Sequence, residues 1–547
     1  MQRLYLESCI VSKYDRVIPA VFFVVFVLLT AQGISWGAPG LWHPDEVLQQ
    51  AVKAIERGYR FDEKDFYYPS LPKYVMYGVG RLVYAVSLDK TKFIEAARLV
   101  SVILGGSVVA LGYVLTRQAG GGVLAGSLTA LFLLSNRDIA IYSRFGHGDI
   151  YLAFFACLTC LLLLMYRRRG HRLWLYGAFL GAGLATSSKY NGMGLFLAAL
   201  VVFLVANRRR LFQDPFAFFE MLFACILLSA FGYAIGTPRS ILSLEFYFQN
   251  AVPAIRRLAT YEIEPDTVSG LFGQWAVLRV ALGSAVFLLF LVTLIWYALK
   301  VIRYYASRHR PDDMRMDLMA IVLLCLFALD LPILFSYRYP PRYLLSTIPM
   351  LAVLTGSFVE EIMQRIEHAR IRYLREVAIA GVAIVIAYSF LRVVAVLLLF
   401  LNDNRIPAGR FLETLPQGAT LEHTYSAPNI PRGHFSKLYE HPSFDKRYAD
   451  QPAPGGNSAK YNKGEAGVER RQPDYLLVDS FTYGDFINES DCVYRQMECE
   501  FYHRLFAGET NYELIKKFDY RLPSFLPVTR ATFVNPVIQI YQRKSSP

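Results

Sequence analysis

The chain has 547 residues, of which 54% are hydrophobic and 18% are charged. An ordinary soluble protein of this length carries more charge, so the composition excludes that class. The formal net charge of +13 would suggest nucleic-acid binding in a soluble protein, but here the basic residues lie beside long apolar runs. That arrangement indicates membrane topology, and we expect no nucleic-acid partner.

Apolar runs of roughly 17–25 residues recur along the chain, and this length is enough to cross a hydrocarbon core of about 30 Å. Membrane-spanning helices are predicted for eleven of these runs, at about 17–36, 96–117, 121–135, 150–166, 174–187, 190–206, 216–236, 276–302, 316–336, 343–361 and 377–400. Membrane lipid is therefore an expected partner of the chain.

A twelfth apolar run, 71–88, contains Lys73 and Arg81. If this run does not span, the arginine clusters at 167–169 and 208–210 face the cytoplasm, as the positive-inside rule requires. We therefore predict an interfacial or re-entrant helix at 71–88. The N-terminus is then cytoplasmic and the C-terminus extracytoplasmic, in a multi-pass protein of the plasma (inner) membrane.

The composition changes sharply after residue 401. We predict a polytopic α-helical membrane domain over 1–401 and a small extracytoplasmic α/β domain over 402–547. The tail has strand-like runs at 475–479 and 537–541 and a helical pattern at 501–518. A polar stretch at 441–473 is expected to be a flexible insertion. Cys492 and Cys499 are able to pair if this tail faces an oxidising compartment.

The first outer loop contains His43-Pro44-Asp45-Glu46 directly after the first span. Two adjacent acids near a membrane surface suit a general base or a metal site. They are also compatible with a solvated pair of loop acids. The residue types alone leave these alternatives open.

The second outer loop reads Tyr-Ser-Arg-Phe-Gly-His-Gly-Asp and ends at Asp149. Its Arg144 either extends its charge to the membrane surface or binds a phosphate with its planar guanidinium. Lys189 is a lone cation at the tip between two apolar helices. Arg338 and Arg342 lie in an outer turn against the charge rule, so they need an anionic partner or water.

At this point the order of the motifs resembles that of protein O-mannosyltransferases. Asp45-Glu46 is followed, from Tyr68, by Tyr-Pro-Ser-Leu-Pro-Lys, where the family has an Asp-Glu pair and then His-Pro-Pro-Leu-Gly-Lys. Ser143-Arg144 with Asp149 resembles the family's second-loop motif. The stretch 187–192 resembles its Ser-x-Lys-Trp-x-Gly, with Tyr190 in the place of Trp.

The stretch from Arg342 to Pro349 is more similar to bacterial relatives, including lipid A aminoarabinose transferases. The sequence also departs from the family, since Tyr68 stands in the place of His and the central lumenal domain of the eukaryotic enzymes is missing. The resemblance therefore leaves the sugar and the acceptor undetermined.

The resemblance implies the GT-C fold and an enzyme that transfers a hexose or pentose from a polyprenyl-phosphate donor to an extracytoplasmic protein, lipid or cell-envelope glycan. Asp45 matches the catalytic base and Glu46 is its neighbour. Cations are needed to neutralise the leaving lipid phosphate, and the expected ones are Arg144, Lys189, Arg338 and Arg342. Other expected site residues are Tyr68, Pro69, Asp149 and Tyr190. No cofactor and no metal ligand is assigned, and the need for a divalent metal is left open.

Two other functions fit a chain with many spans and outward-facing cations. One is a transporter or flippase of lipid-linked sugars, which we would expect to show repeated halves or broken helices within the membrane. The other is a non-catalytic membrane scaffold with the tail as its binding module. Asp45→Ala distinguishes these functions, because it abolishes transfer in an enzyme and leaves a scaffold's partners bound.

The predicted topology can be tested with a fusion after Pro547. An odd number of spans and a cytoplasmic N-terminus place the C-terminus outside, so a reporter enzyme that folds only outside the cytoplasm should be active there. A cytosolic reporter should be inactive at the same position. The opposite pattern would overturn both the topology and the outer location of the site.

Overall fold

The computed structural model describes residues 13–58, 61–63, 65–259, 269–307, 313–337, 339–369, 372–440, 464–487, 496–529 and 531–544. Within it the chain forms two compact units. The first comprises Met1–Ile34 and Asp45–Val394, and the second comprises Ser35–Pro44 and Ala395–Pro547. The short stretch Ser35–Pro44 therefore packs with the C-terminal unit, although it directly follows the first span.

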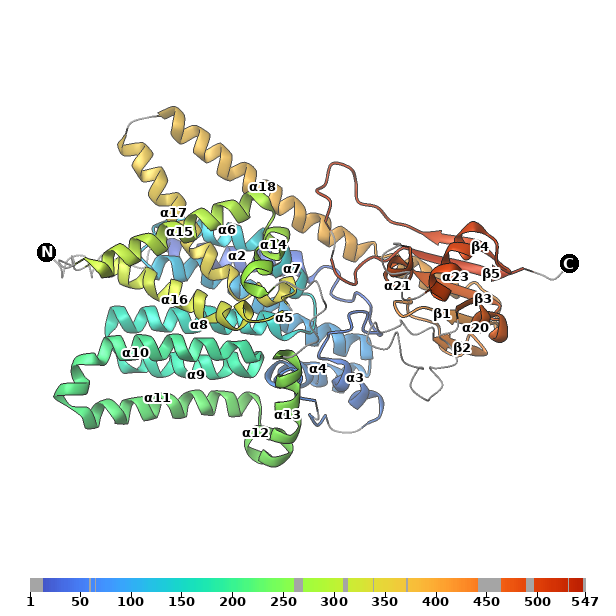
Figure 1. Ribbon diagram of the computed structural model, residues 1–547, viewed down its shortest axis with the longest axis horizontal. Helices are drawn as coiled ribbons and strands as arrows, with labels where there is room; N and C mark the ends of the chain where they lie inside the picture. The colour runs from blue at the N-terminus through green and yellow to red at the C-terminus, as the bar shows by residue number, and fades with distance from the viewer. Residues whose placement is uncertain are drawn as a thin grey trace. The chain divides into compact units, whose positions relative to one another are not determined.

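The first unit is helical (Figure 1). Its elements in chain order are α2 (Lys13–Ala31), α3 (Gln49–Glu56), α4 (Leu71–Ser87), α5 (Lys90–Gln118), α6 (Val123–Leu134), α7 (Arg137–Tyr142), α8 (Gly148–Arg169), α9 (Arg172–Ser188), η1 (Tyr190–Gly192), α10 (Met193–Gln213), α11 (Pro215–Gly236), α12 (Arg239–Leu242), α13 (Leu244–Ala259), α14 (Gly270–Leu282), α15 (Ser284–Ala306), α16 (Met314–Leu334), η2 (Pro341–Leu344), α17 (Ile348–His368) and α18 (Arg372–Leu401), the last of which continues into the second unit.

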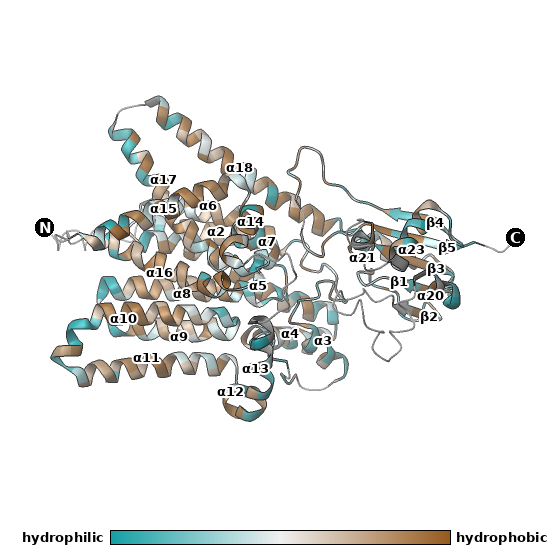
Figure 2. Ribbon diagram, in the orientation of Figure 1, coloured by the Kyte–Doolittle hydropathy of each residue, from teal (hydrophilic) through white to brown (hydrophobic). Residues whose placement is uncertain are grey.

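Long apolar helices dominate this unit, and they are coloured brown along most of their length in Figure 2. Among the described residues, eight helices are long and apolar enough to cross a membrane, and they begin at Tyr14, Lys90, Gly148, Tyr190, Pro215, Ser284, Met314 and Tyr373. Helix α6 is apolar but shorter, and α4 does not meet these criteria. The predicted class of multi-spanning helical protein is confirmed, whereas the count of about eleven spans stays a prediction.

Glycines allow α9 and α11 to run side by side at close range (Figure 1). A Cβ atom on Gly183 would lie 2.0 Å from the carbonyl oxygen of Ser229, and one on Gly232 would lie 2.5 Å from that of Leu180. Helices in lipid gain no hydrophobic drive from contacting each other, so such backbone contact is a main source of their packing energy.

The predicted span 276–302 is divided by a break at Gly283. Helix α14 ends at Leu282 and α15 begins at Ser284, with Gly283 at φ 84°. Glycine adopts this left-handed conformation without the Cβ clash that other residues meet. Arg392 of α18 donates from Nη2 to the carbonyl of Val280 at 2.6 Å, which satisfies a main-chain acceptor at the exposed end of α14.

The second unit is built around a five-stranded sheet with the order β2-β1-β3-β5-β4. Strands β1, β2 and β3 are parallel to one another, whereas β5 is antiparallel to both β3 and β4. Its elements are α19 (Arg405–Leu412), β1 (Thr420–His423), β2 (Lys437–Glu440), α20 (Gly464–Arg471), β3 (Tyr475–Asp479), α21 (Ser480–Tyr483), η5 (Gly484–Phe486), α23 (Gln496–Ala507), β4 (Tyr512–Phe518) and β5 (Ile538–Arg543).

A small domain with a sheet was expected here, and both predicted strand runs are strands. The helical pattern predicted over 501–518 is wrong in its second half, because α23 ends at Ala507 and the chain returns as β4. Gly508, at φ 77°, lies at this change of direction. The predicted flexible insertion lies largely outside the described residues.

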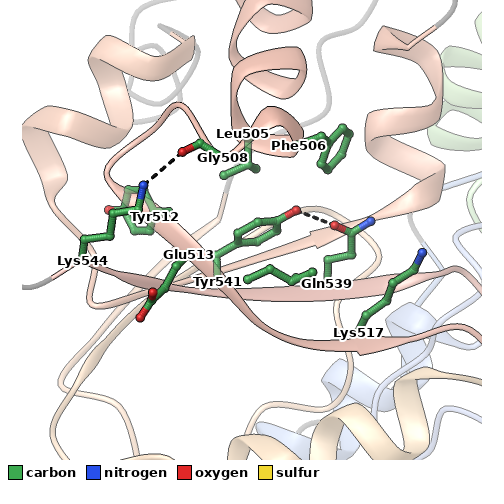
Figure 3. Close-up of a pocket in the computed structure, with 10 residues that line it drawn as sticks. Leu505, Phe506, Gly508, Tyr512, Glu513, Lys517, Gln539, Tyr541 and Lys544 are labelled. Carbon is green, nitrogen blue, oxygen red and sulfur yellow. Dashed lines mark hydrogen bonds between the residues drawn. The ribbon is translucent and has the colours of Figure 1, made fainter.

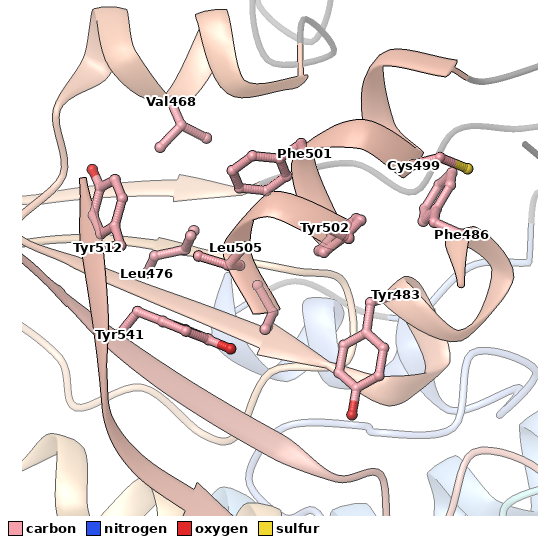
Figure 4. Packing of buried hydrophobic residues seen from close by; sticks show 11 residues of the cluster. Val468, Leu476, Tyr483, Phe486, Cys499, Phe501, Tyr502, Leu505, Tyr512 and Tyr541 are labelled. Atoms are coloured by element: carbon pink, nitrogen blue, oxygen red, sulfur yellow. The ribbon is translucent and has the colours of Figure 1, made fainter. Parts of the chain in front are cut away.

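Two apolar clusters cover the sheet. One joins Leu476 and Tyr541 of the strands to Tyr502 and Leu505 of α23 and to Val468 of α20 (Figure 4). The other gathers strand residues with α19 and comprises Ala408, Leu412, Leu415, Leu421, Phe435, Tyr475, Leu477, Ile538 and Ile540. Alternate residues of β3 thus enter different clusters, which explains why this strand is buried along its whole length.

Cys499 lies in the first of these clusters and takes part in a disulfide. Cys492, the predicted partner, lies outside the described residues. The pairing of these two cysteines therefore stays a prediction.

The stretch Ser35–Pro44 is anchored in the second unit by polar and aromatic contacts. Trp36 donates from Nε1 to Asp403 at 2.9 Å, and the Arg405 guanidinium lies 4.2 Å from the centre of the Trp42 ring. Arg405 and Asp403 also form a fully buried salt bridge of 2.8 Å. Burial of this pair is tolerated because each charge has a partner and further donors and acceptors.

Candidate functional site

Asp45 forms a salt bridge with Arg342 of the turn η2. The Nη1 atom of Arg342 lies 2.6 Å from Oδ2 of Asp45. The Asp45 side chain is 30% exposed, whereas that of Arg342 is 7% exposed. Burial alone would lower the pKa of Arg342, but the carboxylates of Asp45 and Asp149 outweigh burial and raise it. Arg342 is therefore a permanent cation beside an accessible carboxylate.

Lys189 and Asp149 form a second ion pair. Lys189 ends α9, and its ammonium pairs with the carboxylate of Asp149 in the first turn of α8. Both side chains are buried, and burial lowers the pKa of Lys189 against the opposing effect of Asp149. The predicted lone cation at the helix tip thus has a partner on another helix.

Tyr343 connects the two ion pairs. The ammonium of Lys189 lies 3.9 Å from the centre of its ring, and the guanidinium of Arg342 lies 5.8 Å from the same point. A tyrosine face attracts cations, so it holds these two like charges near each other. The side chain follows Arg342 directly in the sequence, but nothing in its residue type marks it as part of a site.

Tyr68 faces the same charges. Burial raises the pKa of its hydroxyl, the nearby Arg342 opposes this, and Asp45, Tyr343 and Asp149 add to it. Its ring contacts the His147 ring edge-on, with 5.3 Å between centroids. We name Asp45, Tyr68, His147, Asp149, Lys189, Arg342 and Tyr343 the ionic cluster.

The ionic cluster draws on five separate stretches of the first unit. They are the loop before α3, the loop before α4, the α7–α8 loop with the start of α8, and the turns after α9 and α16 that carry Lys189 and Arg342. With a neutral histidine it holds two cations and two carboxylates, so its net charge is zero.

Glu46 lies next to Asp45 but is fully buried. Both oxygens of its carboxylate accept from Arg98 of α5, at 2.6 and 3.1 Å, and Oε2 also accepts from the main-chain N–H of Gly146 at 3.1 Å. Arg98 in turn donates to the carbonyl of Ile34. These contacts indicate that Glu46 holds the loop in place and is not accessible to a substrate.

Arg144 is also buried, and each of its nitrogens donates to a main-chain carbonyl. The acceptors are Gln32 and Leu29 near the end of α2, at 3.4 and 3.0 Å, and Ala140 at 2.8 Å. Burial lowers the pKa of Arg144 to about 9, so it remains protonated at neutral pH. Its guanidinium ties the α7–α8 loop to the first span.

The remaining predicted residues lie around the ionic cluster or beyond the described part of the chain. Pro69 is buried beside Tyr68. Tyr190 donates from its hydroxyl to the carbonyl of Phe66 at 2.7 Å and so supports the loop before α4. Arg338 lies outside the described residues.

Lys73, which ends the Tyr68 motif, fastens the same loop. Its ammonium lies 2.8 Å from Glu63 and donates to the carbonyls of Asp65 and Tyr68, at 2.6 and 2.9 Å. Burial raises the pKa of Glu63, and Lys73 opposes this effect. These contacts of the lysine give the motif a defined backbone path.

Within the described ranges, no three His, Cys, Asp or Glu side chains gather closely enough to hold a metal ion. A hollow of about 430 Å³ lies on the second unit and is lined by Phe506, Tyr512, Leu514, Lys517, Tyr541 and four others, together with Lys544 (Figure 3). Lys544 donates there to the carbonyls of Gly508 and Thr510. This hollow contains no predicted site residue.

Residues 81–233 match the dolichyl-phosphate-mannose-protein mannosyltransferase family. This stretch contains the second-loop motif and Lys189 but not Asp45 or Arg342. No curated protein gives a significant match to the chain.

Solved membrane proteins share the architecture. The Archaeoglobus fulgidus oligosaccharyltransferase in its apo form superposes with a TM-score of 0.51 at 14% sequence identity, over 94% of this chain and 81% of that one. The chain has the GT-C fold.

ArnT from Cupriavidus metallidurans is also similar to this GT-C chain, at 14% identity over 95% of this chain and 97% of ArnT. The TM-score is 0.49 for the apo state and 0.46 for the structure bound to undecaprenyl phosphate. The oligosaccharyltransferase comparison thus shows the fold, and the family match adds a similarity to protein mannosyltransferases over residues 81–233.

The different roles of the two adjacent acids can be tested through stability. Glu46→Gln leaves the Arg98 charge buried without its carboxylate, which should cost about 3–5 kcal/mol and lower the Tm of the detergent-solubilised protein. Glu95→Gln is the matched control, because Glu95 forms a more exposed pair with Lys92 on the same helix. An unchanged Tm with lost activity would instead place Glu46 in the chemistry.

Proposed function

We propose that the chain transfers a monosaccharide from a polyprenyl-phosphate donor to an extracytoplasmic acceptor, with Asp45 as the base. The observation that carries this proposal is an accessible carboxylate, Asp45, that pairs with the buried Arg342 and acts electrostatically on a second buried cation, Lys189. A transfer of this kind needs a base for the attacking hydroxyl or amine and positive charge for the leaving phosphate. The family match supports the donor class, because its name specifies a polyprenyl-phosphate sugar.

Asp45 is assigned to the acceptor because it is the more accessible of the cluster's two carboxylates. Its side chain is 30% exposed, whereas that of Asp149 is 2% exposed. The Asp149 carboxylate is also shared between Lys189 and His147. A base has to reach the proton that it removes, so accessibility favours Asp45.

Arg342 and Lys189 are assigned to the donor phosphate. A guanidinium can contact two phosphate oxygens at once, and an ammonium supplies a compact charge. Arg144 was expected to bind the phosphate directly, but its three donor groups already serve carbonyls. We therefore assign it the support of the loop that carries His147 and Asp149.

An apolar groove of about 570 Å³ supports a lipid-linked donor. It lies between α2, α6 and α18 of the first unit and is lined almost wholly by aliphatic side chains, including Val25, Leu128, Leu131, Ile379 and Ile386. An isoprenoid chain has no polar groups to satisfy, so a surface of this kind suits it.

The role of Asp45 is tested by Asp45→Asn, which keeps the shape and removes the base. Turnover should fall roughly 100-fold or more, while binding of the labelled polyprenyl-phosphate sugar in nanodiscs should change little. Asp62→Asn is the control, because this outer-loop acid pairs with Arg239 away from the ionic cluster. Unchanged transfer in Asp45→Asn would refute the proposal, and movement of the donor without transfer would favour a flippase.

The role of Lys189 is tested by the pH dependence of donor binding. A phosphate is bound by the protonated amine. An ordinary lysine loses its proton near pH 10.4, and the lowered pKa means that Lys189 loses its proton at a lower pH than that. Donor affinity should therefore decline with rising pH before an ordinary lysine would lose its proton. Lys189→Arg should remove that decline, because arginine does not titrate there, and Lys189→Gln should bind weakly at every pH. An identical decline in Lys189→Arg would assign it to another group.

A further inference from the structure

We propose that His147 is the proton donor for the leaving phosphate of the glycosyl transfer. This inference rests on the proposed function and adds a general acid on the donor side to the base on the acceptor side. His147 lies in the α7–α8 loop, directly before α8, and its side chain is fully buried.

The two ring nitrogens of His147 have different surroundings. The Nδ1 atom is in close contact with Oδ2 of Asp149. It is also 3.4 Å from the main-chain N–H of Asp149, which is at the long limit of a hydrogen bond. A carboxylate only accepts, so in the charged ring the hydrogen on Nδ1 faces Oδ2 of Asp149.

The Nε2 atom is therefore the nitrogen that gains and loses a proton. It is buried, and across the described residues it has no hydrogen-bond partner. A buried polar atom without a partner is costly, and such atoms in native proteins call for an explanation such as an absent ligand. A carboxylate that holds the other nitrogen is the arrangement by which enzymes orient a histidine for proton transfer.

The charges around His147 come from every element packed on it. Asp149 lies on α8, Lys189 follows α9, and the Tyr68 hydroxyl comes from the loop before α4. Arg342 acts on Asp149 from η2, and Asp149 in turn acts on Tyr142 of α7. Glu46 accepts from Gly146, the preceding residue, but its charge is matched by Arg98.

When the donor is bound, one more positive charge is required to keep the ionic cluster neutral. The cluster is neutral with a neutral histidine, and a phosphodiester donor adds one negative charge. Cleavage turns that group into a phosphate monoester, whose second ionisation has a pKa of about 6 in solution. In a buried site a second negative charge is disfavoured, so a proton delivered to the phosphate lowers the barrier.

The step balances as follows. The acceptor oxygen or nitrogen forms a bond to the anomeric carbon, and its proton passes to Asp45. The bond between the anomeric carbon and the phosphate oxygen breaks, and that oxygen takes the proton from Nε2 of His147. Neutral His147 and protonated Asp45 return to their starting states by exchange with solvent.

The test uses a strain that lacks the gene and carries variants of the full chain. Its membranes, which contain the native acceptors, are supplied with polyprenyl-phosphate mannose labelled in the lipid, and release of the lipid phosphate is followed. Turnover of the unaltered chain should depend on pH, because only a protonated imidazole can donate this proton. His147→Asn should lower turnover roughly 100-fold and abolish that dependence, with donor binding retained.

A matched control and a rescue separate chemistry from structure. His171 also precedes a helix and accepts from its first turn, but it is exposed, so His171→Asn should keep turnover and its pH profile. Added imidazole should partly restore His147→Ala. If His147→Asn does not fold, His147→Gln replaces it in the comparison.

The outcomes that overturn the inference are distinct from failure of the proposed function. A His147 variant that folds, binds donor and keeps the parent pH profile would refute the proton-donor role while Asp45→Asn still abolished transfer. The same conclusion would follow if imidazole failed to restore a folded His147→Ala. If the unaltered chain released no lipid phosphate at any pH, the proposed function itself would fail.

Discussion

The salt bridge between Glu46 and Arg98, with the further contacts of both groups, joins four separate stretches of chain, and the geometry of the candidate site depends on it. Arg98 belongs to α5 and also holds the carbonyl of Ile34 near the end of the first span. Glu46 belongs to the first outer loop and holds the N–H of Gly146 in the second. The carboxylate and guanidinium are both fully buried, and such a pair is tolerated only when the remaining donors and acceptors are satisfied. Its further contacts to main-chain groups meet that requirement.

This pair explains how two adjacent acids can differ so strongly. The Glu46 side chain is buried and its carboxylate pairs with Arg98, whereas Asp45 remains accessible beside Arg342. A base has to be exposed to its acceptor, yet it also has to be held within a few tenths of an ångström of a productive position. Under the proposed function these demands are divided between neighbours, since Glu46 fixes the loop and Asp45 is left for the chemistry.

Much of the fold follows from the sequence, because apolar length is a local property. Each predicted span lies on a helix, but the break at Gly283 was missed because its flanks are apolar and its partner, Arg392, is more than a hundred residues away. The error at 501–518 has a similar cause. The strand Tyr512–Phe518 is exposed on most of its residues, and this edge strand lacks the apolar alternation that marks a half-buried strand.

The site was predictable in its membership more than in its roles. The order of the motifs indicated Asp45, Asp149, Lys189 and Arg342 together, and the structure brings these four charges into one cluster. The positions of Glu46 and Arg144 could not be read in the same way, because their partners include main-chain groups that have no signature in a sequence. The contribution of Tyr343 was equally hidden, since it depends on where its ring lies between two cations.

The neutrality of the ionic cluster connects these observations. A charge in a poorly solvated site is costly, so a cluster without its donor is most stable when cations and carboxylates are equal in number. If the cluster binds the donor as proposed, the same neutrality means that an arriving phosphate finds no pre-existing excess of positive charge. It has to draw Arg342 and Lys189 partly from Asp45 and Asp149, and that exchange leaves the Asp45 carboxylate less tightly paired. A carboxylate released from its cation is a stronger base, because the cation had stabilised its charged form. Donor binding would therefore make Asp45 a stronger base at the moment when an acceptor can use it. In the donor-free protein the pairing with Arg342 would keep Asp45 a weaker base.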